Sequence, residues 1–253
     1  MTVRVTGDEQ PGLPEARLLV VVAVPAEAEA VLRGVGPAER LALPGGTLHR
    51  GRAADVLAAG VGPAAAAAAT ATALALHRYR LVVSAGIGGG FAPHAPVGSV
   101  VLADAIVAAD LGADTPEGFA DVTELGFGTV RHTPPPAAVR LLADALADAA
   151  LPCATGAVLT VSTVTGSAAR ATALAARHPR AVAEAMEGFG VAEAAARHGL
   201  PTLEIRAVSN PVGPRDRSAW RIGEALAALE RVFAALPYPR LLTTVMPKES
   251  PRG

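Results

Sequence analysis

Two glutamates stand where an α/β protein often places its reactive groups, directly after or within segments that look buried. Glu27 follows the apolar run of residues 17–24 and falls at the start of a predicted helix. Glu187 lies between Met186 and Gly188 in an otherwise small and apolar stretch. Carboxylates are rarely buried without a partner. One acid could therefore take a proton from water, and the other could accept hydrogen bonds from sugar hydroxyls.

Each acid also has a structural interpretation that stays open when it is considered alone. Glu27 could simply favour the positive end of a helix dipole, a contribution of about 0.3 to 1 kcal/mol. Glu187 could face solvent on an amphipathic helix while Met186 fills the core. The choice depends on whether the fold brings the two side chains together.

The glycine-rich segment of residues 84–91 offers a backbone that can approach a ligand closely, because glycine has no side chain in the way. A dinucleotide-binding fingerprint would need a third glycine where Phe91 stands. Hydride transfer involving a nicotinamide is therefore disfavoured. A tight structural turn is the alternative interpretation.

Asn210 ends the predicted strand of residues 202–209 and is followed by Pro211. Its amide can both donate and accept hydrogen bonds, which suits the edge of a purine base. An ordinary Asn-Pro turn is the alternative. The charged residues 215–217 could be a solvated cluster of little energetic weight, or a site for a carboxylate, because a guanidinium pairs well with that group.

The elements that must position these residues follow an α/β pattern, in which short β-branched runs alternate with alanine-rich stretches. In such folds, ligands bind at the carboxyl ends of the strands. The pattern predicts one domain over residues 15–237, with a flexible leader at 1–14 and a flexible tail at 238–253. Strands are expected at residues 17–24, 46–52, 53–59, 81–84, 98–106, 156–163 and 202–209. Helices are expected at residues 26–32, 63–80, 134–149, 184–198 and 218–236, and residues 107–130 receive no assignment.

Composition excludes several classes of function. The 253 residues carry 22 basic and 23 acidic side chains, so a basic surface for nucleic acid is not expected. A single cysteine rules out an intramolecular disulfide and a cysteine-rich zinc site, and it fits a cytoplasmic protein. The six histidines show no metal-ligand spacing, no apolar run is long enough to cross a bilayer, and no cofactor is expected.

Taken in order, the acid after the first strand, the glycine-rich segment, the Met-Glu-Gly motif and the Ser-Asn strand end resemble the nucleoside phosphorylase/nucleosidase superfamily over residues 17–236. The resemblance implies a three-layer αβα fold with a mixed, largely parallel sheet, cleavage of an N-ribosidic bond and a homodimer or larger homo-oligomer. It implies catalytic roles for Glu27, Glu187 and Asn210. The expected substrate contacts, the last of them from its charge alone, are Val61, Gly62, Gly88, Gly89, Phe91, Thr163, Val164, Met186 and Arg215.

Two departures point to one branch of that superfamily. Relatives that cleave methylthioadenosine or adenosylhomocysteine usually have aspartate in place of Asn210 and a second acid in place of Ala185. Asn210 with residues 211–220, and the segment 160–166, resemble the futalosine hydrolase family, whose reaction releases hypoxanthine from futalosine in menaquinone biosynthesis. A nucleosidase for the other two substrates, a phosphorolytic relative and a noncatalytic nucleoside-binding module remain alternatives.

Overall fold

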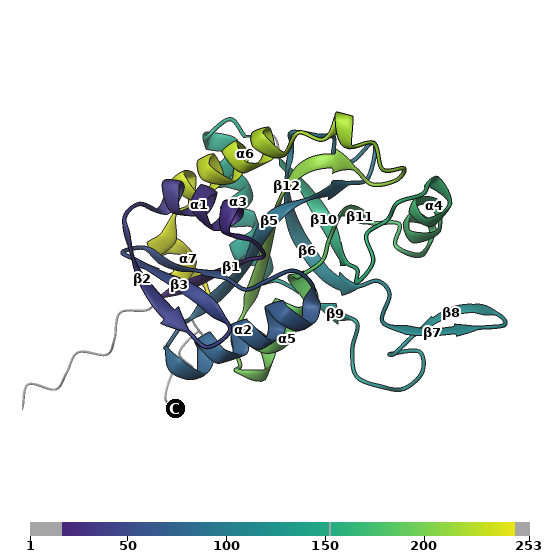
Figure 1. Cartoon of the computed structure of the whole chain (residues 1–253), viewed down its shortest axis with the longest axis horizontal. Coiled ribbons are helices and arrows are strands. Elements are labelled where there is room, and N and C mark those ends of the chain that lie inside the picture. The colour runs from purple at the N-terminus through teal and green to yellow at the C-terminus, as the bar shows by residue number, and fades with distance from the viewer. Residues whose placement is uncertain (1–16, 152, 246–253) are drawn as a thin grey trace, which may run out of the picture.

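The computed structural model describes residues 17–151 and 153–245, which form three layers with a mixed sheet in the middle (Figure 1). This arrangement confirms the predicted αβα class. The main sheet has ten strands. In spatial order nine of them are β11 (Ala181–Ala185), β10 (Cys153–Thr160), β6 (Val100–Ala108), β12 (Thr202–Pro211), β5 (Leu81–Gly90), β1 (Leu18–Val22), β4 (Ala54–Ala58), β3 (Gly46–Gly51) and β2 (Ala38–Leu43), and β9 (Arg131–His132) pairs with β6.

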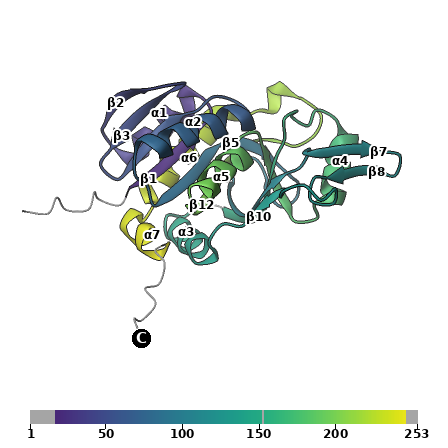
Figure 2. The same cartoon turned by 90° about the horizontal axis from the view of Figure 1, so that it is seen from below.

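Helices cover both faces of this sheet (Figures 1 and 2). The apolar side chains of one face pack against α1 (Pro25–Val35), α3 (Pro136–Asp148), α6 (Ile222–Ala235) and α7 (Tyr238–Thr244). Those of the other face pack against α2 (Pro63–Leu76) and α5 (Gly188–Arg197). The remaining elements are α4 (Ala168–Arg177), the one-turn helix η1 (Arg217–Ala219) and a hairpin of β7 (Gly112–Thr115) and β8 (Gly118–Asp121).

The central strands are parallel, and this places their carboxyl ends at one edge. β1 pairs in parallel with β4 and β5, and β5 pairs in parallel with β12. All five residues of β1 are buried, as expected for a strand covered on both faces. At one end of the sheet, β3 pairs antiparallel with both β4 and the edge strand β2. β11 pairs antiparallel with the end of β5. The ends of β1, β5, β11 and β12 therefore converge.

Several elements differ from the sequence-based expectation. The glycine-rich segment is not a loop, because β5 continues through it to Gly90 and pairs with β12 and β11. Glu184 and Ala185, expected in a helix, belong to strand β11, and the helix begins at Gly188. The helix α4 and the β7–β8 hairpin, which stands out from the body of the protein in Figure 2, were not predicted.

The predicted tail begins too early. Residues 238–244 form α7, and Leu241 is fully buried against the core beneath α3 and α6. The leader at residues 1–14 and the end of the tail, residues 246–253, lie outside the described residues. In the part of the chain that is described, no helix has the length and hydropathy required to cross a membrane.

A close approach of α2 and α5 fixes the positions of their first turns. A methyl group at Gly190 would lie 2.1 Å from the carbonyl oxygen of Pro63, the first residue of α2. The two backbones can therefore meet only if position 190 has no side chain.

We expect Gly190→Ala to lower the free energy of unfolding by about 1–3 kcal/mol, because the added methyl forces the helices apart. Gly223→Ala is the matched control, since nothing lies within 4 Å of the position its methyl would take in α6. Urea unfolding followed by circular dichroism measures both. Equal stabilities of the two variants would show that the helices separate without cost.

Candidate active site

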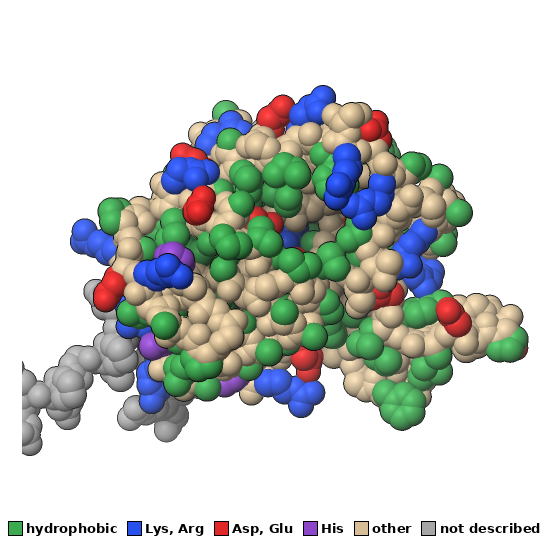
Figure 3. All heavy atoms as spheres, in the orientation of Figure 1, with side chains coloured by type: hydrophobic (Ala, Val, Ile, Leu, Met, Phe, Trp, Pro, Cys, Tyr) green, Lys and Arg blue, Asp and Glu red, His purple; other side chains and the backbone are tan. Residues whose placement is uncertain are grey.

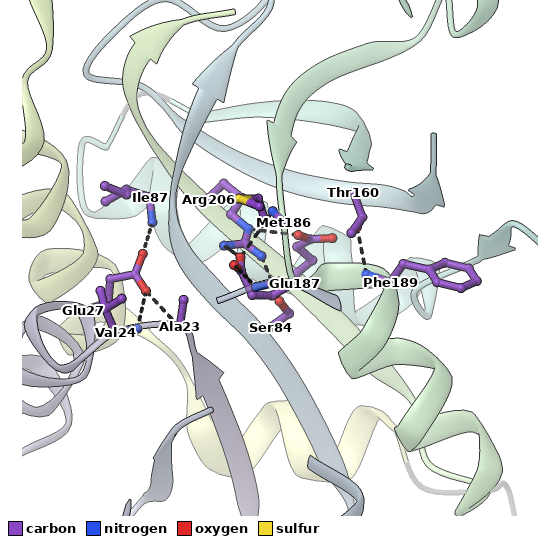
Figure 4. A network of polar contacts seen from close by, with 12 residues as sticks. Ala23, Val24, Glu27, Ser84, Ile87, Thr160, Met186, Glu187, Phe189 and Arg206 are labelled. Carbon is purple, nitrogen blue, oxygen red and sulfur yellow. Dashed lines mark hydrogen bonds and ion pairs between the residues drawn. The ribbon is translucent and has the colours of Figure 1, made fainter. Parts of the chain in front are cut away.

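A buried arginine lies at the centre of the converging strand ends. Arg206 of β12 is completely buried and donates three side-chain hydrogen bonds. Its Nε donates to Glu204 Oε1 at 2.9 Å, its Nη1 to Glu187 Oε2 at 3.3 Å, and its Nη2 to Ser84 Oγ at 3.1 Å. Figure 4 shows this network between β5, β12 and the start of α5. A buried charge that is paired in this way has a fixed orientation.

Glu187 links this arginine to two helix starts. It is the residue before α5, and its Oε1 accepts a hydrogen bond from the backbone N–H of Gly62 at 3.2 Å. Gly62 is the residue before α2. The starts of two helices and a guanidinium therefore surround one carboxylate. The close packing of α2 and α5 is what allows the contact.

Glu27 is held by backbone donors from two strands. Its Oε2 accepts from the N–H groups of Ala23 at 2.9 Å and Val24 at 3.2 Å, and its Oε1 accepts from Ile87 N–H at 2.9 Å. The residue is only 4% exposed. Burial raises the pKa of Glu27, and the nearby charge of Glu187 raises it further, against the hydrogen bond from Ile87 and the charge of Arg206.

Glycines allow these charged groups to approach one another. A methyl group at Gly86 would lie 2.6 Å from Glu27 Oε1 and 2.7 Å from Arg206 Nη1. Glu27 Oε1 and Arg206 Nη1 therefore both lie beside Gly86 of β5, in the space that a side chain at this position would occupy. A methyl group at Gly188 would lie 2.3 Å from both carboxylate oxygens of Glu204, which gives the glycine of the Met-Glu-Gly motif a physical reason.

The ionisation of the cluster reflects its burial. Burial disfavours the charged form of Arg206, but Glu204, Glu187 and Glu27 outweigh this and raise its pKa. Burial also raises the pKa of Glu204. The Oε2 atom of Glu204 is buried with no hydrogen-bond partner among the residues that the structure describes. Arg206 therefore stays positively charged, and its charge acts on three carboxylates, those of Glu204, Glu187 and Glu27.

Asn210 lies four residues beyond Arg206 on β12, beside Gly89 of β5. A methyl group at Gly89 would lie 3.3 Å from Asn210 Nδ2. The amide Oδ1 accepts from Ser209 Oγ at 2.8 Å, and Nδ2 donates to the Pro211 carbonyl at 3.0 Å. These local bonds orient the amide, which is partly exposed at the strand end.

A further buried acid, Glu184, belongs to β11, and its backbone pairs with that of Gly89 in β5. Its Oε1 accepts from the backbone N–H of Thr165 at 2.8 Å, and its Oε2 accepts from the hydroxyl of the same residue. Burial raises the pKa of Glu184. Through Thr165 this acid anchors the loop of residues 161–167, in which Thr163 and Val164 are exposed.

The structure brings most of the predicted site residues to this edge of the sheet. Gly88 of β5 lies against Arg206, since a methyl group at position 88 would be 3.7 Å from the Arg206 Cβ, and Val61 is exposed beside Gly62. Phe91, the residue after β5, is 6% exposed and packs into the apolar cluster of β6 and β10. Arg215 lies on the exposed segment after β12. In the space-filling view, acidic and basic atoms are visible at the bottom of a hollow near the middle of the face shown (Figure 3).

Sequence reasoning missed the residues that hold the site together, namely Arg206, Glu204, Ser84 and Glu184. A signal for two of them was present. Glu204 and Arg206 are two residues apart in an otherwise apolar predicted strand, so they share one face of it. Opposite charges at that spacing in a buried strand indicate a functional ion pair.

The site contains no obvious place for a metal ion. Within the described ranges, no group of three or more histidine, cysteine, aspartate or glutamate side chains is arranged to hold one. The available groups are a buried guanidinium, carboxylates of raised pKa and an amide. These groups can move a proton, bind hydroxyls and bind a heterocycle.

The fold and this set of groups define a protein of the phosphorylase superfamily, whose sequence profile matches residues 17–236, and the chain belongs to that superfamily. A futalosine hydrolase of Streptomyces coelicolor is 65% identical over 219 residues, which cover 84% of this chain and 91% of the relative. A futalosine hydrolase of Acidothermus cellulolyticus is 49% identical over 218 residues, which cover 86% of this chain and 89% of the relative. Within the superfamily, the chain belongs to the futalosine hydrolase family.

The fold is also shared with more distant enzymes. The crystal structure of 5′-methylthioadenosine/S-adenosylhomocysteine nucleosidase from Neisseria meningitidis, in complex with methylthio-immucillin-A, superimposes with a TM-score of 0.77. The match covers 87% of this chain and 97% of that one at 19% identity. At this identity the likeness concerns the fold alone.

Proposed function

We propose that this chain hydrolyses the N-ribosidic bond of futalosine, releasing hypoxanthine and dehypoxanthine futalosine in menaquinone biosynthesis. The observation that carries the proposal is the placement of Glu27 and Glu187 close to the Nη1 end of Arg206, in a chain 65% identical to a futalosine hydrolase. Cleavage of this bond leaves positive charge on the sugar carbon and negative charge on the departing purine. The transition state is oxocarbenium-like, as in glycoside hydrolysis.

Glu27 acts as the general base. It takes a proton from a water molecule whose oxygen forms the new bond to the sugar carbon, while the electron pair of the old bond leaves with the purine. The purine takes up a proton from solvent water, and Glu27 returns its proton to solvent. Because burial raises the pKa of Glu27, the carboxylate is a stronger base than an exposed glutamate. The three backbone donors fix its position before substrate arrives.

Glu187 accepts hydrogen bonds from the ribose hydroxyls and places negative charge near the developing cation. Arg206 is a positioning residue that holds the Glu187 carboxylate in its orientation. Met186, which is partly buried beside it, packs against the sugar.

Hydrolysis is favoured over phosphorolysis by the charge of the site. A phosphate nucleophile needs free cations, but each nitrogen of the Arg206 guanidinium already donates to Glu204, Glu187 or Ser84. The remaining groups near Glu27 are carboxylates, which repel a phosphate dianion. Water is the nucleophile that this site accommodates.

The purified chain is expected to release hypoxanthine from futalosine without added phosphate. The variant Glu27→Gln is expected to lower kcat by at least about a hundredfold while substrate still binds.

The pH dependence of the reaction follows from the same residue. A base must be unprotonated, so activity is lost as pH falls through the raised pKa of Glu27. The acidic limb of the kcat/KM profile should therefore lie above pH 4.5, the ordinary value for the group. Chromatography that quantifies the released hypoxanthine, carried out over a series of pH values, measures the loss of activity in the variant and the position of the acidic limb.

Glu29→Gln serves as the matched control, because Glu29 lies on the same helix but is exposed. Its activity should equal that of the unmodified chain. Strict dependence on phosphate would overturn the hydrolytic assignment, and near-normal turnover of Glu27→Gln would remove Glu27 from the mechanism. Binding of nucleosides without turnover of futalosine, methylthioadenosine or inosine would indicate a noncatalytic binding module.

Asn210 sets the preference for the purine. Hypoxanthine has a carbonyl at position 6, which requires a donor, whereas adenine has an amine there, which favours an acceptor. An amide can donate to the carbonyl or to N7. A carboxylate would place acceptor against acceptor, an unpaired arrangement that costs about 1–3 kcal/mol.

We therefore expect Asn210→Asp to shift the ratio of kcat/KM values from 6-oxo towards 6-amino nucleosides by about 5-fold to 150-fold, the range to which 1–3 kcal/mol corresponds. Competing futalosine with its 6-amino analogue in one reaction measures the ratio directly. Ser209→Ala, which removes a bond to the amide but keeps the amide itself, should change the ratio less. An unaltered ratio in Asn210→Asp would exclude this residue as the selector.

We further propose that the chain forms a homodimer or larger homo-oligomer. Leu111, just before the β7–β8 hairpin, is 43% exposed, and Leu125 and Phe127, after it, are 39% and 68% exposed. Apolar side chains gathered on one projecting segment favour association. Light scattering of the purified protein is expected to give a multiple of 25.3 kDa. A mass of one chain at micromolar concentration would contradict this proposal.

A further inference from the structure

Two arginines flank the only tryptophan of the sequence on the segment between β12 and α6. The guanidinium carbon of Arg215 lies 5.4 Å from the centroid of the Trp220 ring, and that of Arg217 lies 5.9 Å from it. Both distances are within the range of cation–π attraction. The ring therefore holds two long cationic side chains in restricted positions at the surface.

Both positive charges are without an acidic partner. Across the described part of the chain, no carboxylate oxygen lies within 4.0 Å of the Arg215 or Arg217 guanidinium. Asp216, between them in sequence, is engaged locally, since its Oδ1 accepts from Ser218 N–H at 3.0 Å and Ser218 Oγ at 2.5 Å.

Some exposed arginines elsewhere in the described part of the chain have an acidic partner. Arg33 lies 2.6 Å from a carboxylate oxygen of Glu230, and Arg197 lies 2.9 Å from one of Glu193. The pair on Trp220 thus differs from these parts of the surface, where charge is balanced by neighbouring side chains.

The segment is tied to the site at both ends. At its start Val212 N–H donates to the carbonyl of Gly90 at 2.8 Å, and at its end Arg221 N–H donates to the carbonyl of Ser209 at 2.8 Å. Arg215 also lies against the loop of residues 161–167, because a methyl group at Gly166 would be 3.5 Å from its Cγ and Cδ. The cluster therefore sits beside the strand end that carries Asn210.

The other side of the segment reaches the Glu27 region. β1 and β12 are both parallel to β5, so α1 and α6, which follow them, begin at the same edge of the sheet. The two helices lie side by side (Figure 1), with Arg33 paired to Glu230. Residues 212–221 therefore run from the loop of residues 161–167 towards the start of α1, along the rim of the site. Figure 3 shows basic side chains gathered over this segment, above the hollow.

We propose that Arg215, Arg217 and Trp220 bind an aryl carboxylate, which in the proposed function is the aromatic acid at the end of futalosine remote from the purine. The buried floor binds base and ribose, so the rest of the substrate must leave through the rim that these residues border. The indole stacks on the aryl ring, and a guanidinium forms a bidentate pair with the carboxylate. Since the arginines are already held on the ring, little side-chain freedom is lost on binding.

The test compares futalosine with its methyl ester, which keeps the shape but removes the charge. The Glu27→Gln background allows binding to be measured without turnover, and the fluorescence of Trp220 reports directly from the proposed site because the chain has no other tryptophan. We expect futalosine to change the emission and to bind at least tenfold more tightly than the ester. The double change Arg215→Gln and Arg217→Gln should remove this discrimination and raise KM for futalosine in the active chain with little effect on kcat.

Arg231→Gln is the control, because Arg231 is an exposed arginine of α6 outside the cluster and its loss should leave the discrimination intact. Unchanged discrimination in the double variant, or an effect equal to that of Arg231→Gln, would overturn the inference. If the chain binds futalosine through the two arginines but does not cleave it, the proposed function fails and the carboxylate site stands. If it cleaves futalosine and the ester equally well, the function stands and the site fails.

Discussion

The pairing of Arg206 with its neighbouring carboxylates is the interaction on which the rest of the site depends. The guanidinium is fully buried and contacts groups from three separate elements, Ser84 of β5, Glu187 before α5 and Glu204 of its own strand. Removing one partner of a buried ion pair costs about 3–5 kcal/mol because the other is left uncompensated. The same requirement that keeps the fold together also orients the carboxylate proposed to bind ribose. Arg206 therefore contributes both to the stability of the fold and to the position of Glu187.

The class of fold and the approximate place of the site could be predicted from the sequence because both depend on local signals. A fully apolar run such as β1 and an alanine-rich helix with proline at its start are short-range patterns. The two glutamates could be singled out because an acid in an apolar context is unusual. That they meet around one arginine depends on the order of β1, β5 and β12 in the sheet, which no single segment specifies.

The errors have the same physical origin. The strand was expected to end at residue 84, but β5 continues through glycines that are otherwise depleted in strands, because parallel and antiparallel neighbours hold it. Glu184 was assigned to a helix by composition, whereas its carboxylate is bound by Thr165 and its backbone extends the sheet. Tertiary contacts decided each of these positions.

The run of glycines that ends β5 has a consequence for how the protein becomes functional. Glycine loses more backbone entropy on ordering than any other residue, so the strand that forms the floor of the site is among the elements least able to order by itself. Its conformation is imposed by β1, β11 and β12, which come from the beginning and the last third of the chain. A nascent chain that still lacks β12 therefore has no partly formed binding site. The ability to bind a nucleoside appears only when the sheet is complete.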